Sequence, residues 1–212
     1  MEKLDLAKKY RAYYTAKLHP ELATIEAVTY LSIPGQGDPS SEGFAEKIEA
    51  LYTVAYGVKF LSKANHRDFV VPKLEGLWWF DEDAFGGVSM ADAPLKIPRH
   101  LWYYRLLIRM PDFITPTLVT EASAKAFQKR KAVTIKEVGL HDMKQRTVVQ
   151  MLHTGAFSRE PETLERMQMF IMDHKLTKAG LHQEVYLSDF RKTAEAKLRT
   201  ILREPVETTD PI

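Results

Sequence analysis

The feature that most constrains the fold is a strand–turn–helix–strand pattern that occurs twice. In the first half TYLSIPGQG precedes a helical stretch and KLEGLWW, and in the second VQMLHTGAF precedes a helical stretch and HQEVYLS. Two such halves, side by side about a pseudo-two-fold axis, would bring both closing strands and their glutamates near the shared axis. We therefore predict an α+β fold in a single domain, residues 1–212, with repeats at about 24–110 and 132–206 and a lead-in at 1–20.

Apolar periodicity and turn residues predict the individual elements. Pro34 and Gly35 are expected to end the first strand, and Pro72 and Gly76 mark the second as irregular or an edge. The loop 81–98 is long enough to be a lid. The predicted strands are 27–33, 68–80, 100–110, 132–141, 146–154 and 181–188, and the predicted helices 42–61, 115–131, 162–174 and 194–203.

Composition excludes several classes of function. The 30 basic and 28 acidic residues give a net charge of +2, so no global field recruits nucleic acid or membrane. Without cysteine there are no disulfides, thiolate metal sites or cysteine nucleophile. No HExxH, paired-histidine, P-loop or GxGxxG pattern occurs, so we predict neither metal nor cofactor. The charged N-terminus and the lack of an 18-residue apolar run predict a cytoplasmic protein, and no pattern indicates its oligomeric state.

The stretch LHQEVYLSDFR (181–191) alternates as a strand does. Val185 lies on one side, and His182, Glu184 and Tyr186 lie on the other. One interpretation is a solvated face with Glu184 merely exposed, as most acids are. The other is a pocket wall, in which Glu184 is a general base for water or a counter-charge for a cationic ligand and Tyr186 contacts the ligand.

A second carboxylate, Glu75, is a candidate for the same pocket. Two close carboxylates would raise one pKa and suit acid–base chemistry. The alternative is an edge-strand charge. Within KLEGLWW the alternation places Trp79 with Glu75 and Trp78 on the other face. We therefore predict Trp79 as a ligand contact and Trp78 as core.

Further aromatic and histidine side chains are candidates for binding a flat ligand. Tyr52 and Tyr56 lie four residues apart on a predicted helix, and Tyr104 lies on the third predicted strand. Each has the alternative of an ordinary core or interface position. His153 and His182 are candidates for assisting proton transfer, although a histidine near a strand end is more often structural.

Four segments carry a resemblance: FAEKIEALYTVAYGVKF, DFVVPKLEGLWWF, MLHTGAF and LHQEVYLSDFRKTAEAKLRTILREPV. Over about residues 33–206 the chain resembles the GyrI-like small-molecule-binding proteins, most of all the stand-alone branch without a DNA-binding domain. The resemblance implies two βαββ (SHS2-type) repeats around a central cleft. It implies a glutamate on the last core strand, matched by Glu184, at the cleft centre. Phe157 and Phe190 depart from the Tyr and Pro of many relatives, so Phe157 is a candidate aromatic contact without a phenol role.

The resemblance also implies two activities. Multidrug-responsive relatives bind cationic aromatic drugs, and some stand-alone members hydrolyse the strained cyclopropane of DNA-alkylating natural products. We expect the second, with water activated by Glu184 and Glu75 polarising it or relaying the proton. The alternatives are a non-catalytic module that sequesters aromatic drugs and an inhibitor that binds another protein through the same surface.

Overall fold

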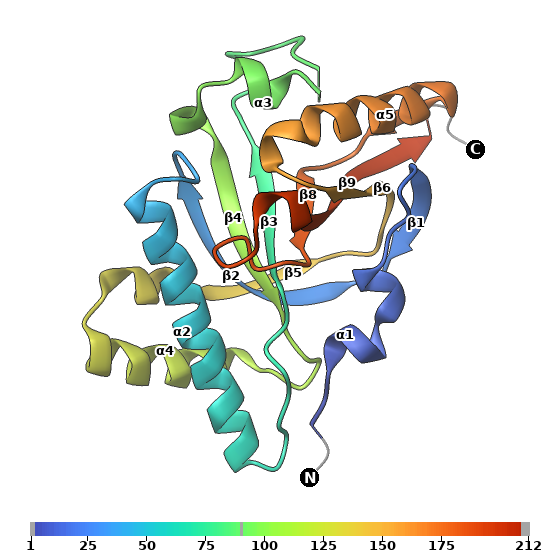
Figure 1. The fold of residues 1–212 in the computed structure, drawn as a ribbon. Helices are drawn as coiled ribbons and strands as arrows, with labels where there is room; N and C mark the ends of the chain where they lie inside the picture. The colour runs from blue at the N-terminus through green and yellow to red at the C-terminus, as the bar shows by residue number, and fades with distance from the viewer. Residues whose placement is uncertain (1–2, 90, 209–212) are drawn as a thin grey trace.

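The computed structural model describes residues 3–89 and 91–208, whose strands form one antiparallel sheet in the order β1-β6-β9-β8-β3-β4-β2-β5, with β7 paired to β9 (Figure 1). The strands are β1 (Glu21–Ile25), β2 (Val28–Gln36), β3 (Leu74–Trp79), β4 (Tyr103–Arg109), β5 (Gly139–Met143), β6 (Arg146–Thr154), β7 (Leu176–Lys178), β8 (His182–Tyr186) and β9 (Arg199–Thr208). The helices are α1 (Leu6–Lys9), α2 (Glu42–Ala64), α3 (Ala93–Lys96), α4 (Pro116–Arg130) and α5 (Glu160–Asp173). Short 3-10 helices occur at Arg11–Tyr14, Arg99–Leu101, Val133–Glu137, Phe157–Arg159 and Glu195–Lys197.

The order of elements agrees with the predicted architecture. The unit β2-α2-β3-β4 is followed by β6-α5-β8-β9, with the short β7 between α5 and β8, and the strands β3 and β8 pair in the middle of the sheet. The α+β class is therefore confirmed. The pseudo-two-fold relation between the units and the single-domain boundaries stay predictions.

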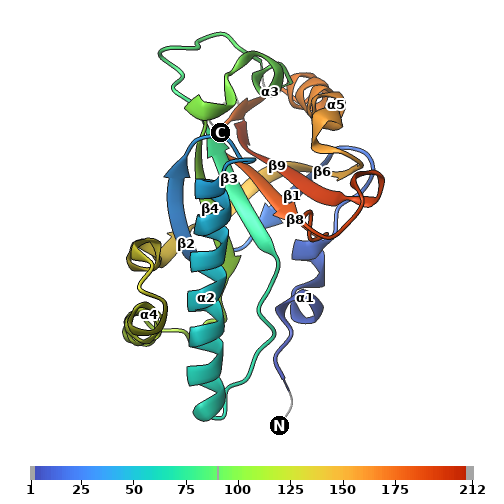
Figure 2. The same ribbon diagram turned by 60° about the vertical axis from the view of Figure 1, so that its left-hand side comes forward.

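One face of the sheet, the helix face, is covered by α2 and α5. Helix α2 packs over β2 and β4, α5 packs on β6, and α4 lies beside α2 (Figures 1 and 2). Phe44 and Leu51 of α2 join an apolar core with Leu106 of β4, and Met167 of α5 packs on Leu202 of β9. These buried side chains fix α2 and α5 over the two halves of the sheet.

The opposite face, the back face, is covered by the N-terminal segment. Tyr13 is 5% exposed and packs with Tyr30, Leu77 and Leu107. The segment predicted as a lead-in is thus part of the core, and it is followed directly by β1, which the sequence did not predict.

One expected strand end and one expected helix differ from the structure. Strand β2 continues through Pro34 to Gln36. Strand β5 pairs only with Val28–Ser32, so beside Pro34 that edge of β2 has no partner strand, and the missing N–H of the proline removes no hydrogen bond there. The prediction of a helix at residues 194–203 is wrong, because only Glu195–Lys197 form a short 3-10 helix and the chain enters β9 at Arg199. Strand β9 lies between β6 and β8 and is buried from Thr200 to Val206, and this sheet environment outweighs helix-forming composition.

Residues 132–141 also depart from the prediction, since a 3-10 helix precedes β5 there. The loop 81–98 contains α3, and its role as a lid stays a prediction. None of the helices in the described part is long and apolar enough to cross a membrane.

Candidate active site

The register between β3 and β8 decides which side chains meet. Gly76 pairs with Glu184, and Glu75 pairs with Val185. Side chains alternate between the faces of a strand, so this offset of one residue puts Glu184 on the helix face and Glu75 on the back face. The expectation that both glutamates would line one pocket is therefore corrected: the sheet separates them.

Glu184 lies on the helix face of β8 between His182 and Tyr186. Its Oε1 lies 3.5 Å from Nε2 of His182, and burial together with the negative charge of Glu184 raises the pKa of the neighbouring Tyr186 phenol. The Tyr186 oxygen in turn accepts from Nε1 of Trp78 at 3.0 Å. The side chain of Glu184 is 13% exposed and Tyr186 is 6% exposed. This face of β8 is therefore enclosed rather than solvated.

Sequence reasoning missed two further carboxylates. Glu204 of β9 binds Nδ1 of His182 and is 1% exposed. Glu160, the first residue of α5, is 8% exposed, and its Oε1 is buried without a hydrogen-bond partner in the described part of the chain. An acid before Pro161 at a helix start is ordinarily explained by the helix dipole, so no local signal marks it.

Burial and charge give these groups different protonation states. Burial, and next the negative charge of Glu184, raise the pKa of Glu160 well above its usual value. Burial opposes a charge on His182, but Glu204 and Glu184 outweigh it and raise the pKa of His182 to about 10. Burial and Glu184 also raise the pKa of Tyr186. Burial thus favours the protonated form of Glu160 and the neutral phenol of Tyr186, and the carboxylates favour the imidazolium of His182, an arrangement suited to acid–base chemistry.

Aromatic rings cover this cluster. Tyr186 meets Phe157 at 6.1 Å and Phe190 at 5.5 Å between ring centroids, both edge to face. Trp78 packs on Tyr104 at 5.5 Å. Trp78, predicted as core alone, therefore also binds Tyr186 beside the cluster. Tyr104 is 2% exposed and packs against the Trp78 ring.

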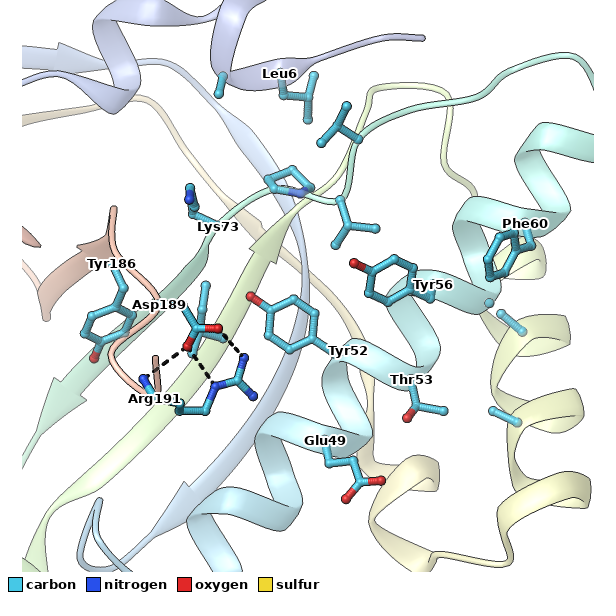
Figure 3. A pocket seen from close by; sticks show the side chains of 18 of the residues that line it. Leu6, Glu49, Tyr52, Thr53, Tyr56, Phe60, Lys73, Tyr186, Asp189 and Arg191 are labelled. Atoms are coloured by element: carbon cyan, nitrogen blue, oxygen red, sulfur yellow. Dashed lines mark hydrogen bonds and ion pairs between the residues drawn. The ribbon is translucent and has the colours of Figure 1, made fainter. Parts of the chain in front are cut away.

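A groove of about 1310 Å³ reaches Tyr186 along α2. Tyr52 and Tyr56 point their hydroxyls into it from α2, and Tyr186 stands on the facing wall (Figure 3). Arg191, bound by Asp189 through two nitrogens, lies over the Tyr52 ring at 5.7 Å. The structure thus brings three of the predicted binding tyrosines to one surface.

Other candidate residues lie elsewhere. Trp79 shares the back face with Glu75, as predicted, and stacks on Tyr103 at 5.7 Å, away from Glu184. His153 is bound by Thr163 at 2.8 Å and by the carbonyl of Ala156 at 3.1 Å, as a structural histidine is.

On the back face, Glu75 is fully buried and accepts from Tyr13 at 2.5 Å and Gln183 at 2.7 Å. Burial raises its pKa. Among residues 3–89 and 91–208, no group of three or more potential metal ligands is arranged to hold an ion.

Fold and site together define an α+β protein that encloses a carboxylate–imidazole cluster beneath aromatic side chains. An uncharacterized conserved protein from Listeria innocua has a similar structure, with a TM-score of 0.85 and 32% identity over 97% of this chain and 100% of that chain. A hydrolase from Listeria innocua matches with a TM-score of 0.82 at the same identity and coverage. This chain belongs to the family of these Listeria proteins.

A more distant structure, the C-terminal domain of EcmrR, shares the fold. Its TM-score is 0.56 at 12% identity, over 90% of this chain and 98% of that domain. No protein-family model and no curated protein matches the chain.

Proposed function

We propose that this protein is a hydrolase of the stand-alone GyrI-like branch, which opens the strained cyclopropane of flat aromatic DNA-alkylating toxins by adding water. The observation that carries the proposal is the pair of carboxyl groups on the helix face: Glu184, which pairs with His182, and Glu160, whose pKa is raised by burial and by the charge of Glu184. Such a pair supplies a base and an acid at one pH. Membership in the family of a Listeria innocua hydrolase supports the same class of reaction.

The reaction balances with these two groups alone. Glu184 takes a proton from water, and the water oxygen bonds to a ring carbon of the cyclopropane. The carbon–carbon bond of the ring breaks, and its electron pair moves into the conjugated aromatic system, which receives a proton from Glu160. The product is the substrate plus one water. Proton exchange between the two carboxyl groups then restores the starting state.

The aromatic side chains supply the binding surface for a flat substrate. Phe157 and Phe190 pack edge to face on Tyr186, and Phe190, Tyr52 and Tyr56 line the groove that reaches Tyr186. Aromatic walls with a few polar groups are typical of sites for flat ligands.

Charge favours hydrolysis over the sequestration of cations. Glu184 and Glu204 share one cation, the His182 imidazolium, so the cluster keeps a negative charge, and what disfavours a cationic ligand is the charge of the groove. The groove presents more cations than carboxylates, which favours a neutral or anionic ligand. Its cations are Lys73, Lys125, Lys129, Arg130, Arg191 and Lys192, and its carboxylates are Asp5, Glu49 and Asp189.

The test is incubation with a duocarmycin-type compound in ¹⁸O-labelled water, followed by mass spectrometry. We expect a product heavier by one labelled water. Glu184→Gln and Glu160→Gln should each lower the single-turnover rate by about 10²–10⁴-fold, the usual worth of a general base or acid.

Glu75→Gln is the matched control, because it makes the same change on the back face. Stoichiometric binding without product would overturn the hydrolase proposal and leave sequestration. Equal rates in Glu184→Gln and the wild-type protein would remove Glu184 from the reaction.

A further inference from the structure

His182 lies between two carboxylates that come from different strands. Its Nδ1 binds Glu204 of β9, and its Nε2 lies 3.5 Å from Oε1 of Glu184 on its own strand. Both ring nitrogens thus face acceptors, and both can donate only when the ring carries two protons. The geometry therefore selects an imidazolium rather than either neutral tautomer.

The surroundings supply no other cation for these carboxylates. The ion pairs that join described residues give Glu184 and Glu204 one cationic partner, His182. The other titratable groups that face the ring are Glu160 of α5 and Tyr186 of β8, and β3 contributes the uncharged Trp78 as the cross-strand neighbour. Because Glu204 is 1% exposed, its charge acts on the ring with little screening.

We propose that His182 is a positioning residue, held as an imidazolium by Glu204, that keeps Glu184 anionic and so directs the shared proton of the carboxyl pair to Glu160. This inference rests on the proposed hydrolytic function. The charge of His182 thereby makes Glu184 the base and Glu160 the acid, although both side chains are glutamates. Without the ring's charge, Glu160 and Glu184 would hold one proton between them, and the base would be protonated for part of the time.

Removing either partner should change the pH dependence of turnover in its own way. In His182→Gln the base loses its cationic neighbour, so the acidic limb of the kcat profile should move up by about 1–2 pH units, with a 10–100-fold loss below that limb. In Glu204→Gln the His182 ring loses one of its two carboxylate neighbours, so the imidazolium should release its proton nearer neutral pH. The basic limb should then move down toward pH 7–8, an effect that a merely structural role does not produce.

The experiment measures kcat and KM for a duocarmycin-type compound from pH 5 to 10 in the wild-type protein, both variants and His141→Gln. His141 lies on the distant strand β5 and serves as the control. In parallel, ¹⁵N NMR of the histidine rings follows the protonation of His182 without any need for turnover. We expect both ring nitrogens to stay protonated through pH 8 in the wild-type protein and to lose this state earlier in Glu204→Gln.

The outcomes separate the two proposals. No turnover in the wild-type protein overturns the hydrolase function, and this inference with it. Normal turnover with profiles that coincide in all four proteins overturns the inference alone. A His182 ring that titrates near its ordinary value of 6.5 in the wild-type protein also overturns it, whatever the rates.

Discussion

At the scale of single residues, the site consists of Glu184 and the titratable side chains around its carboxylate. Glu184 is visible in the sequence because it alternates with apolar residues on a strand. Glu160 and Glu204 are not, because one sits at a helix start and the other in a segment whose composition favours helix. Their importance comes from burial near Glu184 and His182, which arises only in the folded sheet.

Glu160 should destabilise the folded protein at neutral pH. Its pKa is raised on folding, so the unfolded chain releases the proton first, and the penalty grows as the pH rises above about 4.5. We expect Glu160→Gln to raise the free energy of unfolding at pH 8 by roughly 1–3 kcal/mol while it lowers turnover. Urea unfolding at pH 4 and pH 8 measures this, and an equal effect at both pH values would contradict it.

His182 should give a dependence of the same sign, shifted to higher pH. Its pKa rises from 6.5 to about 10 on folding, so its stabilisation is complete below about pH 6.5 and is lost as the pH passes through 10. We expect the wild-type free energy of unfolding to fall by more than about 1 kcal/mol between pH 7 and 10. His182→Gln should lose much less over that range, and His141→Gln should follow the wild-type protein. Denaturant titrations at several pH values decide the matter.

At the scale of elements, the pairing of β3 with β8 builds the site. Gly76 lies under the Trp78–Tyr186 hydrogen bond, and a Cβ there would stand 2.7 Å from Nε1 of Trp78 and 3.0 Å from the Tyr186 oxygen. The glycine is therefore needed for close approach, rather than as the mark of an edge strand that the sequence suggested.

Gly76→Ala should cost about 1–3 kcal/mol and reduce turnover, because Tyr186 must move away from Glu184. Gly43→Ala is the matched control: nothing lies within 4 Å of its Cβ position in the first turn of α2. That change should stabilise by about 0.5–1 kcal/mol and leave turnover unaltered. If Gly76→Ala has the stability and turnover of the wild-type protein, the contact is unimportant.

The sequence predicts elements where one local signal dominates. Strand β6 and helices α2 and α4 follow from alternation, apolar stripes and capping residues such as Ser41. Strand β9 could not be predicted, because the helix formers directly before it, Ala194, Ala196, Lys197 and Leu198, favour a helix that continues into it, and only its neighbours on both sides make it a strand. The pocket side of β3 was also misassigned, since a register offset of one residue is not encoded in either strand alone.

At the scale of the whole molecule, the two faces of the sheet should be separable. Tyr13 donates to Glu75 at 2.5 Å, its oxygen meets Tyr30 at 2.6 Å and accepts from Gln183 at 3.3 Å. Tyr13→Phe leaves a buried carboxylate short of a donor and should cost about 1–3 kcal/mol. Turnover of the folded protein should be unchanged, because the site lies on the helix face.

Tyr103→Phe is the control on the same face. Tyr103 stacks on Trp79, and its hydroxyl is not part of the hydrogen-bond network of Tyr13, Glu75 and Gln183. It should change stability by no more than about 0.5 kcal/mol. Thermal melts and single-turnover rates of both variants give the answer. A large loss of turnover in folded Tyr13→Phe would show that the faces are coupled.

The N-terminal segment also sets the order in which this chain can assemble. Tyr13 contacts Glu75, 62 residues away, Gln183, 170 residues away, and through its carbonyl Arg203, 190 residues away. Contacts of such sequence separation form late, because a long loop must close before they contribute. During synthesis the first twenty residues would therefore emerge long before the strands β3, β8 and β9 that they contact, and Tyr13 would stay exposed to solvent until then. The back face can close only once β9 has left the ribosome, so the N-terminal segment docks late in folding.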